Sequence, residues 1–128
     1  MRPAMVLLPL LSAIVSCVMA QNYDDSELLN REREDYRLTL STPTRPHIGK
    51  NRVLARLSYP SRRPITNAQV TFRYQMPGMR GSANGVQTDE GIYEAEVDLG
   101  MGGEWTITVE IERPAFEKIE ETFVIDAE

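Results

Sequence analysis

Strict alternation of apolar and polar residues is the feature that most constrains the fold of this 128-residue chain. In residues 93–99, for example, apolar side chains at the odd positions alternate with acidic ones at the even positions. The pattern recurs from residue 36 onward, and no long segment with the 3.6-residue period of a helix competes with it. The segments that we expect to form strands are 36–40, 52–59, 70–76, 86–88, 93–99, 105–111 and 119–125.

A strand with one apolar and one polar face belongs to a sheet that is covered on one side only. Seven such strands in about 90 residues predict an all-β fold, an immunoglobulin-like antiparallel β-sandwich of about seven strands. Trp105 is expected at the centre of the core. If strands 93–99 and 105–111 are neighbours, their outward acidic residues form one strongly acidic face. Glu121 interrupts the apolar alternation of the last strand and is interpreted as a bulge.

The first 20 residues have the pattern of an export signal. A positively charged start with Arg2 precedes a mostly apolar run over residues 4–15. Small side chains then precede a possible cleavage point after Ala20. Cleavage after Ala20 is one expectation. Residues 14–17 also resemble a bacterial lipobox, in which Cys17 is lipidated, and an uncleaved anchor is the third alternative. All three place the remaining chain outside the cytoplasm, with residues 21–35 as a polar tether and residues 36–128 as the folded domain.

Charge and residue counts argue against several classes of function. The formal net charge is −5 and the pI is about 5.0, which is unfavourable for binding nucleic acid. One Cys cannot supply a disulfide framework or a thiolate zinc cluster, and one His cannot supply a multi-histidine metal centre. The sequence also lacks a G-x-S-x-G motif, a P-loop and a dinucleotide fingerprint. We therefore expect a protein that is not an enzyme.

Methionine is the remaining source of soft metal ligands. Three of the six Met residues lie beyond residue 20, and these are Met76, Met79 and Met101, each at a place where a strand is expected to end. Thioether sulfur is a soft ligand that suits Cu(I). His47 lies in a predicted loop and is the candidate for a fourth ligand. The sequence thus predicts a Cu(I) site at one end of the sandwich.

Two metal-free interpretations of the same methionines stay open. Met76 continues the inward-facing side of strand 70–76, and Met101 continues that of strand 93–99, so both could pack in the core. The three side chains could also form an apolar rim that binds a protein partner.

Five segments occur in an order that resembles the YtkA-like domain family, which is related to FixH-type proteins. They are Gly49-Lys50-Asn51, residues 65–70 (ITNAQV), residues 76–79 (MPGM), residues 91–95 (GIYEA) and residues 101–105 (MGGEW). The resemblance covers residues 36–125. Many members carry further Met or His residues after the MP-x-M segment, where this chain has residues 80–84 (RGSAN).

The resemblance implies an extracytoplasmic immunoglobulin-like sandwich without enzymatic activity, often anchored by a lipid or a membrane segment. Some members occur in copper handling, cytochrome oxidase assembly or metal efflux. The expected function is therefore a binding or accessory domain of the cell envelope, in the periplasm or secreted, with copper trafficking as the candidate activity. A metal-free structural or protein-interaction module is the alternative. The expected partner is an unidentified envelope protein, with membrane attachment through Cys17 or an uncleaved amino-terminal segment.

Overall fold

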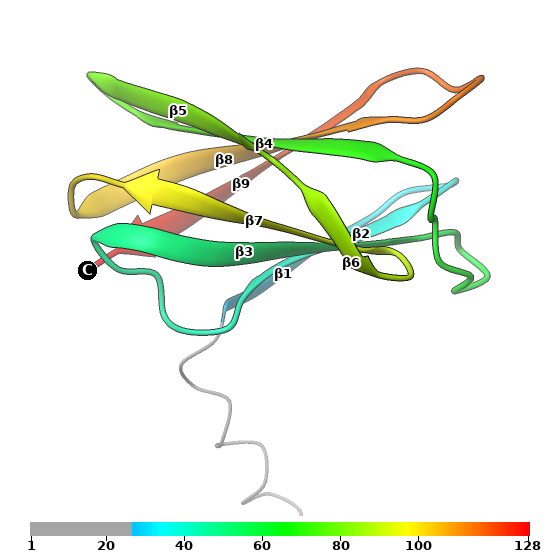
Figure 1. Ribbon diagram of the computed structural model, residues 1–128, viewed down its shortest axis with the longest axis horizontal. Coiled ribbons are helices and arrows are strands. Elements are labelled where there is room, and N and C mark those ends of the chain that lie inside the picture. Colours follow the sequence, from blue (N-terminus) through cyan, green and yellow to red (C-terminus); the bar gives the residue numbers. More distant parts are fainter. Residues whose placement is uncertain (1–26) are drawn as a thin grey trace, which may run out of the picture.

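The computed structural model describes residues 27–128, which form two antiparallel sheets packed face to face (Figure 1). The five-stranded sheet has the order β1-β2-β3-β7-β6, and the four-stranded sheet has the order β5-β4-β8-β9. The strands are β1 (Glu27–Glu32), β2 (Arg37–Thr42), β3 (Gly49–Ser58), β4 (Gln69–Met76), β5 (Met79–Asn84), β6 (Val86–Asp89), β7 (Ile92–Leu99), β8 (Gly103–Glu112) and β9 (Ile119–Ala127). In this part of the chain, no helix has the length and apolar character needed to cross a membrane. The predicted export signal and Cys17 lie outside the described residues.

Buried and exposed side chains alternate along the strands, as the sequence predicted. In β8 and β9, every second side chain is buried between the sheets, and Trp105 is 1% exposed. Trp105, Tyr93 and Phe72 are the largest side chains of the core. The antiparallel β-sandwich is therefore confirmed, because each strand contributes one apolar face to a shared interior.

Two strands of the described chain lack an apolar signature, so the strand number exceeds the expected seven. β5 lies outside the segments that were expected to form strands, but it pairs with β4 because the tight turn at Pro77 and Gly78 (φ 84°) returns the chain along the same edge. β1 lies within the predicted tether of residues 21–35. That prediction is corrected over Glu27–Glu32, which pairs with β2 in unbroken register from Thr42 to Arg37. Backbone pairing along a free sheet edge stabilises these two strands without an apolar run.

The predicted acidic face is not formed by neighbouring strands. β7 belongs to the five-stranded sheet and β8 to the four-stranded sheet, so their outward acidic residues lie on opposite faces of the sandwich. Each face also pairs acids with bases across strands, as Glu94 does with Arg52 at 3.5 Å and Glu110 with Arg73 at 2.5 Å. The condition for one strongly acidic face is therefore not met.

β9 contains no bulge at Glu121. Its register with β8 is continuous from Ala127 to Ile119, and Glu121 occupies a regular inward position with 5% of its surface exposed. The break in apolar alternation reflects a buried carboxylate, whose partners are described below.

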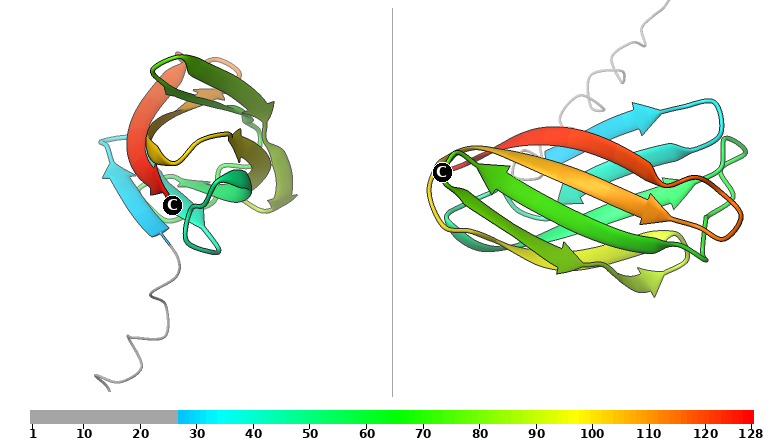
Figure 2. Two further views of the ribbon diagram at one scale, coloured as in Figure 1. Left: turned by 90° about the vertical axis from the view of Figure 1, so that its left-hand side faces the viewer. Right: turned by 90° about the horizontal axis from the view of Figure 1, so that it is seen from above.

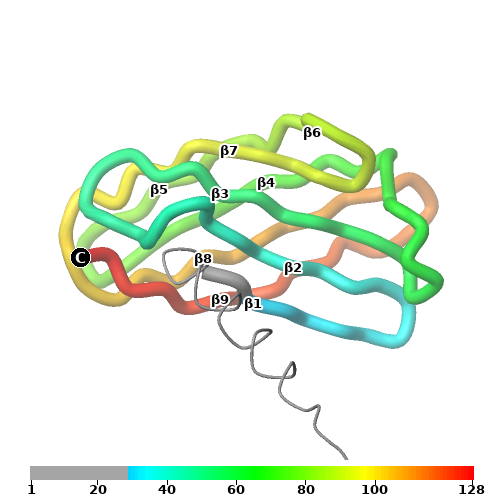
Figure 3. Tube along the Cα trace, turned by 90° about the horizontal axis from the view of Figure 1, so that it is seen from below, coloured from blue at the N-terminus to red at the C-terminus, as the bar shows by residue number. Residues whose placement is uncertain are grey.

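The two ends of the sandwich carry different loops (Figures 2 and 3). One end holds the β2–β3 loop, the β4–β5 turn, the β7–β8 turn and the C-terminus, and we call it the methionine end because Met76, Met79 and Met101 lie there. The other, which we call the opposite end, holds the β1–β2, β3–β4, β6–β7 and β8–β9 connections.

Candidate functional site

Met76 and Met79 close the β4–β5 hairpin as a cross-strand pair. Pro77 and Gly78 lie between them, and the positive φ of Gly78 (84°) suits the sharp reversal of the chain. Met76 is half-buried and packs against the core, whereas Met79 is 36% exposed. The sequence thus places two thioethers at one turn, with Met76 half-buried and Met79 more exposed.

Met101 lies in the β7–β8 turn at the same end. Trp105 holds this turn, because its indole Nε1 donates a hydrogen bond of 2.8 Å to the Met101 carbonyl oxygen. The Trp105 ring is buried and lies 6.2 Å from the ring of Tyr74 on β4. Met101 is 55% exposed, so its side chain is not part of the core. A fixed backbone therefore presents an accessible thioether.

The side chains of the hairpin lie over the glycines of the β7–β8 turn. A Cβ atom added to Gly100 would lie 2.7 Å from the methyl carbon of Met79 and 3.9 Å from its sulfur. A Cβ atom added to Gly103 would lie 3.5 Å from the methyl carbon of Met76. The structure thus brings Met76 and Met79 against the turn that carries Met101, and Gly100 provides the space for this approach.

The loop of His47 reaches the same end. Its neighbour Ile48 lies 3.4 Å from a Cβ position on Gly102, and the Ile48 backbone N–H bonds to the Glu128 carbonyl oxygen at 3.4 Å. Buried Asn51 shapes the loop, because its side-chain amide donates to the His47 carbonyl oxygen at 2.7 Å. The imidazole of His47 is exposed, and its Nδ1 lies 3.3 Å from the carbonyl oxygen of Arg45. The loop thus lies at the methionine end, and the His47 ring faces the backbone of this same loop.

Harder ligands do not gather in the described part of the chain. Residues 27–128 contain no group of three or more His, Cys, Asp or Glu side chains arranged to hold a metal ion. The candidate ligand set at the methionine end is therefore thioether sulfur, with one imidazole on an adjacent loop.

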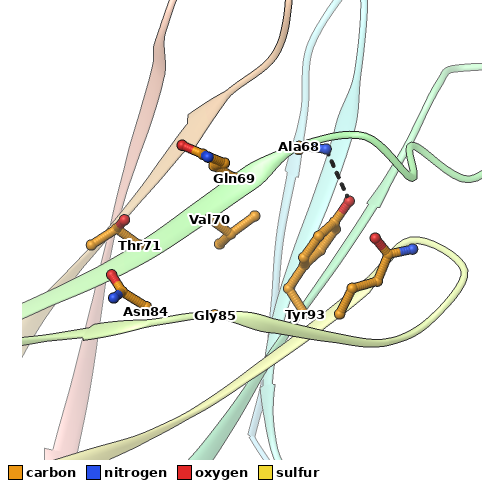
Figure 4. A pocket seen from close by; sticks show the side chains of 8 residues that line it. Ala68, Gln69, Val70, Thr71, Asn84, Gly85 and Tyr93 are labelled. Carbon is orange, nitrogen blue, oxygen red and sulfur yellow. Dashed lines mark hydrogen bonds between the residues drawn. The ribbon is translucent and has the colours of Figure 1, made fainter.

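A second concave region lies where the chain crosses from β5 in one sheet to β6 in the other (Figure 4). Gly85 makes the crossing, and its N–H donates to the Val70 carbonyl oxygen at 2.7 Å. Tyr93 forms one wall, because its hydroxyl donates to the Ile65 carbonyl oxygen at 2.8 Å and accepts from the Ala68 N–H at 3.3 Å. The lining residues are Ala68, Gln69, Val70, Thr71, Asn84, Gly85, Gln87 and Tyr93.

This pocket offers amides, a hydroxyl and backbone groups, and burial raises the pKa of its tyrosine, Tyr93. A phenol of raised pKa is a poor base near neutral pH. The lining residues include no carboxylate, imidazole or thiol, so the pocket lacks the groups for acid–base or nucleophilic catalysis.

Sequence reasoning missed the buried carboxylate cluster around Glu121. Arg33 donates two hydrogen bonds to this carboxylate, from Nε at 2.7 Å and from Nη2 at 2.6 Å. The Tyr36 hydroxyl donates a third, and Nε of Arg31 lies 4.0 Å away. The signal was present in the sequence, because Glu121 has the inward position of its strand and a buried acid needs a cationic partner.

These contacts shift the pKa of each member. The bonds from Arg33 hold the pKa of Glu121 below its usual value, while burial and the bond to Glu121 raise the pKa of Tyr36 to about 12. Because Arg33 and Tyr36 belong to the β1–β2 connection and Glu121 to β9, the cluster joins the edges of the two sheets. Its groups are mutually satisfied, which indicates a structural role.

Comparison with known proteins identifies the family and the fold of this chain. A family model described as YtkA-like matches residues 30–110. A comparison with the curated proteins finds no match. Among solved structures, a DUF4785 family protein from Legionella pneumophila subsp. pneumophila str. Philadelphia 1 is similar, with a TM-score of 0.54 and 17% sequence identity. The alignment covers 72% of this chain and 28% of that protein, and the likeness shows the fold alone.

Proposed function

The chain belongs to the YtkA-like family, and we propose that it is a non-enzymatic binding domain outside the cytoplasm that captures Cu(I) through methionine thioethers. The observation that carries the proposal is the contact between the β4–β5 hairpin and the β7–β8 turn. Met79 lies over Gly100, and Met101 is the next residue of that turn. Met76 stands opposite Met79 in the hairpin and completes a set of three.

The chemistry of the set suits a soft monovalent cation. A thioether binds Cu(I) as a neutral ligand, so capture releases no proton and the site retains the charge of the ion. Met101 and Met79 are 55% and 36% exposed, which gives the ion a route in from solvent. Met76 is half-buried and forms the inner side of the site. An open site of this kind would pass Cu(I) to an envelope partner that offers stronger ligands.

His47 is a secondary candidate within this proposal. Its loop lies at the methionine end, and its ring is exposed, with Nδ1 at 3.3 Å from the carbonyl oxygen of Arg45. A His47→Gln variant would measure its contribution, since the three thioethers are proposed to bind without it.

Export is the second part of the proposal. The apolar run within residues 1–20 supports cleavage after Ala20, lipidation of Cys17, or retention as an anchor. Mass spectrometry of the mature amino terminus distinguishes these routes. A chain that begins at Gln21 supports signal-peptide cleavage, and an acylated Cys17 supports a lipoprotein. An intact Met1 in a cytoplasmic fraction would contradict export.

An anaerobic Cu(I) titration tests the metal site. The variants are a Met76→Leu, Met79→Leu double variant and a Met101→Leu single variant, because leucine nearly preserves volume and removes sulfur. We expect the parent protein to bind one Cu(I), and each variant to bind at least about tenfold more weakly. Ile48→Leu is the matched control, since it changes an exposed apolar side chain at the same end, and its affinity should equal that of the parent. No binding by the parent, or equal affinity in all four proteins, would contradict the proposal.

A metal-free interaction module is the second candidate function. It is favoured by three exposed apolar side chains at the methionine end. The exposed fractions are 54% for Ile48, 36% for Met79 and 55% for Met101. An exposed apolar group of this kind is typical of a surface that binds a protein partner. Under this alternative, the leucine variants retain partner binding and the parent protein binds no Cu(I).

A further inference from the structure

Arg113 is a charged side chain buried at the opposite end of the sandwich. It directly follows β8 and continues the inward-facing series of Val109 and Ile111, and 7% of its surface is exposed. An arginine that is more than nine-tenths buried is unusual unless it is paired, because removing a charge from water is costly.

Its guanidinium has no ionic partner in residues 27–128. Nε of Arg113 is buried without a hydrogen-bond partner, and it is the one side-chain nitrogen or oxygen of the described chain in this condition. None of the ion pairs in this part of the molecule includes Arg113. Acids are available nearby in sequence, since Glu112 precedes it and Glu117 lies in the same loop, but both side chains are exposed and form no pair with it.

The contact that the guanidinium does make is aromatic. Its central carbon lies 4.2 Å from the centre of the Phe116 ring, and Phe116 is itself 56% exposed. A cation–π contact compensates only part of the cost of burying a charge, and it satisfies no N–H donor. The Phe116 ring and the unpaired Nε–H donor of the guanidinium together form a receptor with an apolar half and a cationic half.

The other buried charge among residues 27–128 shows the contrast. Glu121 is 5% exposed and accepts three hydrogen bonds, from two nitrogens of Arg33 and from the Tyr36 hydroxyl. The fold therefore satisfies one buried charge fully and leaves the second without a counter-ion. A buried donor without a partner in the chain is a feature that a ligand can satisfy.

We infer that Arg113 and Phe116 form a binding site for a carboxylate attached to an apolar group. The carboxylate accepts charge-assisted hydrogen bonds from the guanidinium, and the apolar group packs on the exposed ring. Two sources offer this chemistry, namely a small carboxylic acid and the carboxyl terminus of a peptide with an apolar last residue. The site lies at the end of the sandwich away from the methionines, so it is independent of the proposed copper site.

Binding is tested on the folded protein with sodium phenylacetate at constant ionic strength, followed by the NMR signal of the Arg113 Nε–H group and by calorimetry. We expect a saturable shift with the parent protein, at least about tenfold weaker binding in Arg113→Met, and no saturable shift with sodium chloride. A short peptide ending in phenylalanine and its C-terminal amide distinguish the two sources, since tighter binding of the free acid peptide than of phenylacetate identifies a chain terminus.

Arg63→Met is the matched control. Arg63 lies at the same end and is stacked on Tyr59 at 5.2 Å, but it is exposed to solvent. This variant should bind phenylacetate as the parent does. Equal binding by Arg113→Met and Arg63→Met, or no saturable binding by the parent, would overturn the inference.

Stability separates a ligand site from a structural role. If Arg113 serves a ligand, Arg113→Met removes an uncompensated buried charge, and the urea midpoint should equal or exceed that of the parent. If Arg113 holds the fold, the variant unfolds at lower urea or fails to fold, and either result contradicts the inference. Arg113→Lys supplies a second comparison, since it keeps the charge and should bind phenylacetate more weakly because it lacks the planar fork.

Discussion

Replacing Glu121 with glutamine tests whether a buried carboxylate joins the edges of the two sheets. The substitution preserves the shape of the side chain and removes its charge. One carboxylate oxygen becomes an NH₂ group that faces an N–H donor of Arg33, in place of a bond of 2.6 or 2.7 Å. If the oxygen that remains is at the Oε2 position, it can still accept from Nε of Arg33 and from the Tyr36 hydroxyl.

The expected loss follows from these contacts. A hydrogen bond to a charged group contributes about 1.5–3 kcal/mol, and one between neutral groups about 0.5–1.5 kcal/mol. Glu121→Gln loses one charge-assisted bond and weakens the others, so we expect unfolding to become easier by about 2–3 kcal/mol. This loss of unfolding free energy is smaller than the largest losses seen when a buried ion pair is broken, because the side chain of Arg33 is 50% exposed and can be solvated by water.

Equilibrium unfolding in urea measures this effect, with fluorescence of Trp105 as the probe. The chain has a single Trp, and it is 1% exposed in the folded state. Glu120→Gln is the control, because Glu120 is the adjacent residue of β9 and its side chain is 49% exposed. We expect this control to change stability by less than about 0.5 kcal/mol. A loss in Glu121→Gln no larger than in Glu120→Gln would refute the reasoning.

Three further predictions follow from the geometry. Stability should fall as the pH drops below about 4.5, because folding lowers the pKa of Glu121. It should also fall as the pH rises from 10 to about 12, because folding raises the pKa of Tyr36. A urea midpoint that stays constant across both pH ranges would contradict the role of the Glu121 cluster in stability. Gly91→Ala should destabilise by more than about 1 kcal/mol, because φ is 71° and the added methyl would lie 2.8 Å from a β3 carbonyl oxygen; calorimetry showing an unchanged melting temperature would disprove this. Arg31→Met should promote self-association, because Arg31 covers the edge of β9 by donating to the Thr122 carbonyl oxygen at 2.8 Å; light scattering that matches the parent would count against it.

The sequence predicted the sandwich because its strongest signal, period-2 alternation, reports directly on which side chains face the core. β7 and β8 carry this signal over most of their length, β9 carries it except at Glu121, and all three lie where it indicated. β1 and β5 carry no apolar alternation, since they lie at sheet edges and form through backbone pairing. The sequence also did not predict that β7 and β8 belong to different sheets, because alternation identifies the faces of a strand but not its neighbours.

The candidate site was predictable in part. Turn signals in residues 76–79 and 100–103 located the methionines at strand ends, and the antiparallel order brings those two turns to one end. The contact between Met79 and Gly100 depends on how the two sheets are stacked, which no local pattern encodes. Arg113 escaped notice because a single arginine after a strand usually faces solvent, whereas here it is buried and stacks against Phe116 of the β8–β9 loop.

The central claim, that three thioethers from two turns act together on one ion, is tested most directly by NMR of methionine methyl groups. The protein would carry ¹³C-labelled methionine and be titrated with Cu(I) without oxygen. We predict that the methyl signals of Met76, Met79 and Met101 shift together and stop shifting at one equivalent of Cu(I). Signals that remain in place, or that shift for one methionine alone, would contradict a shared site.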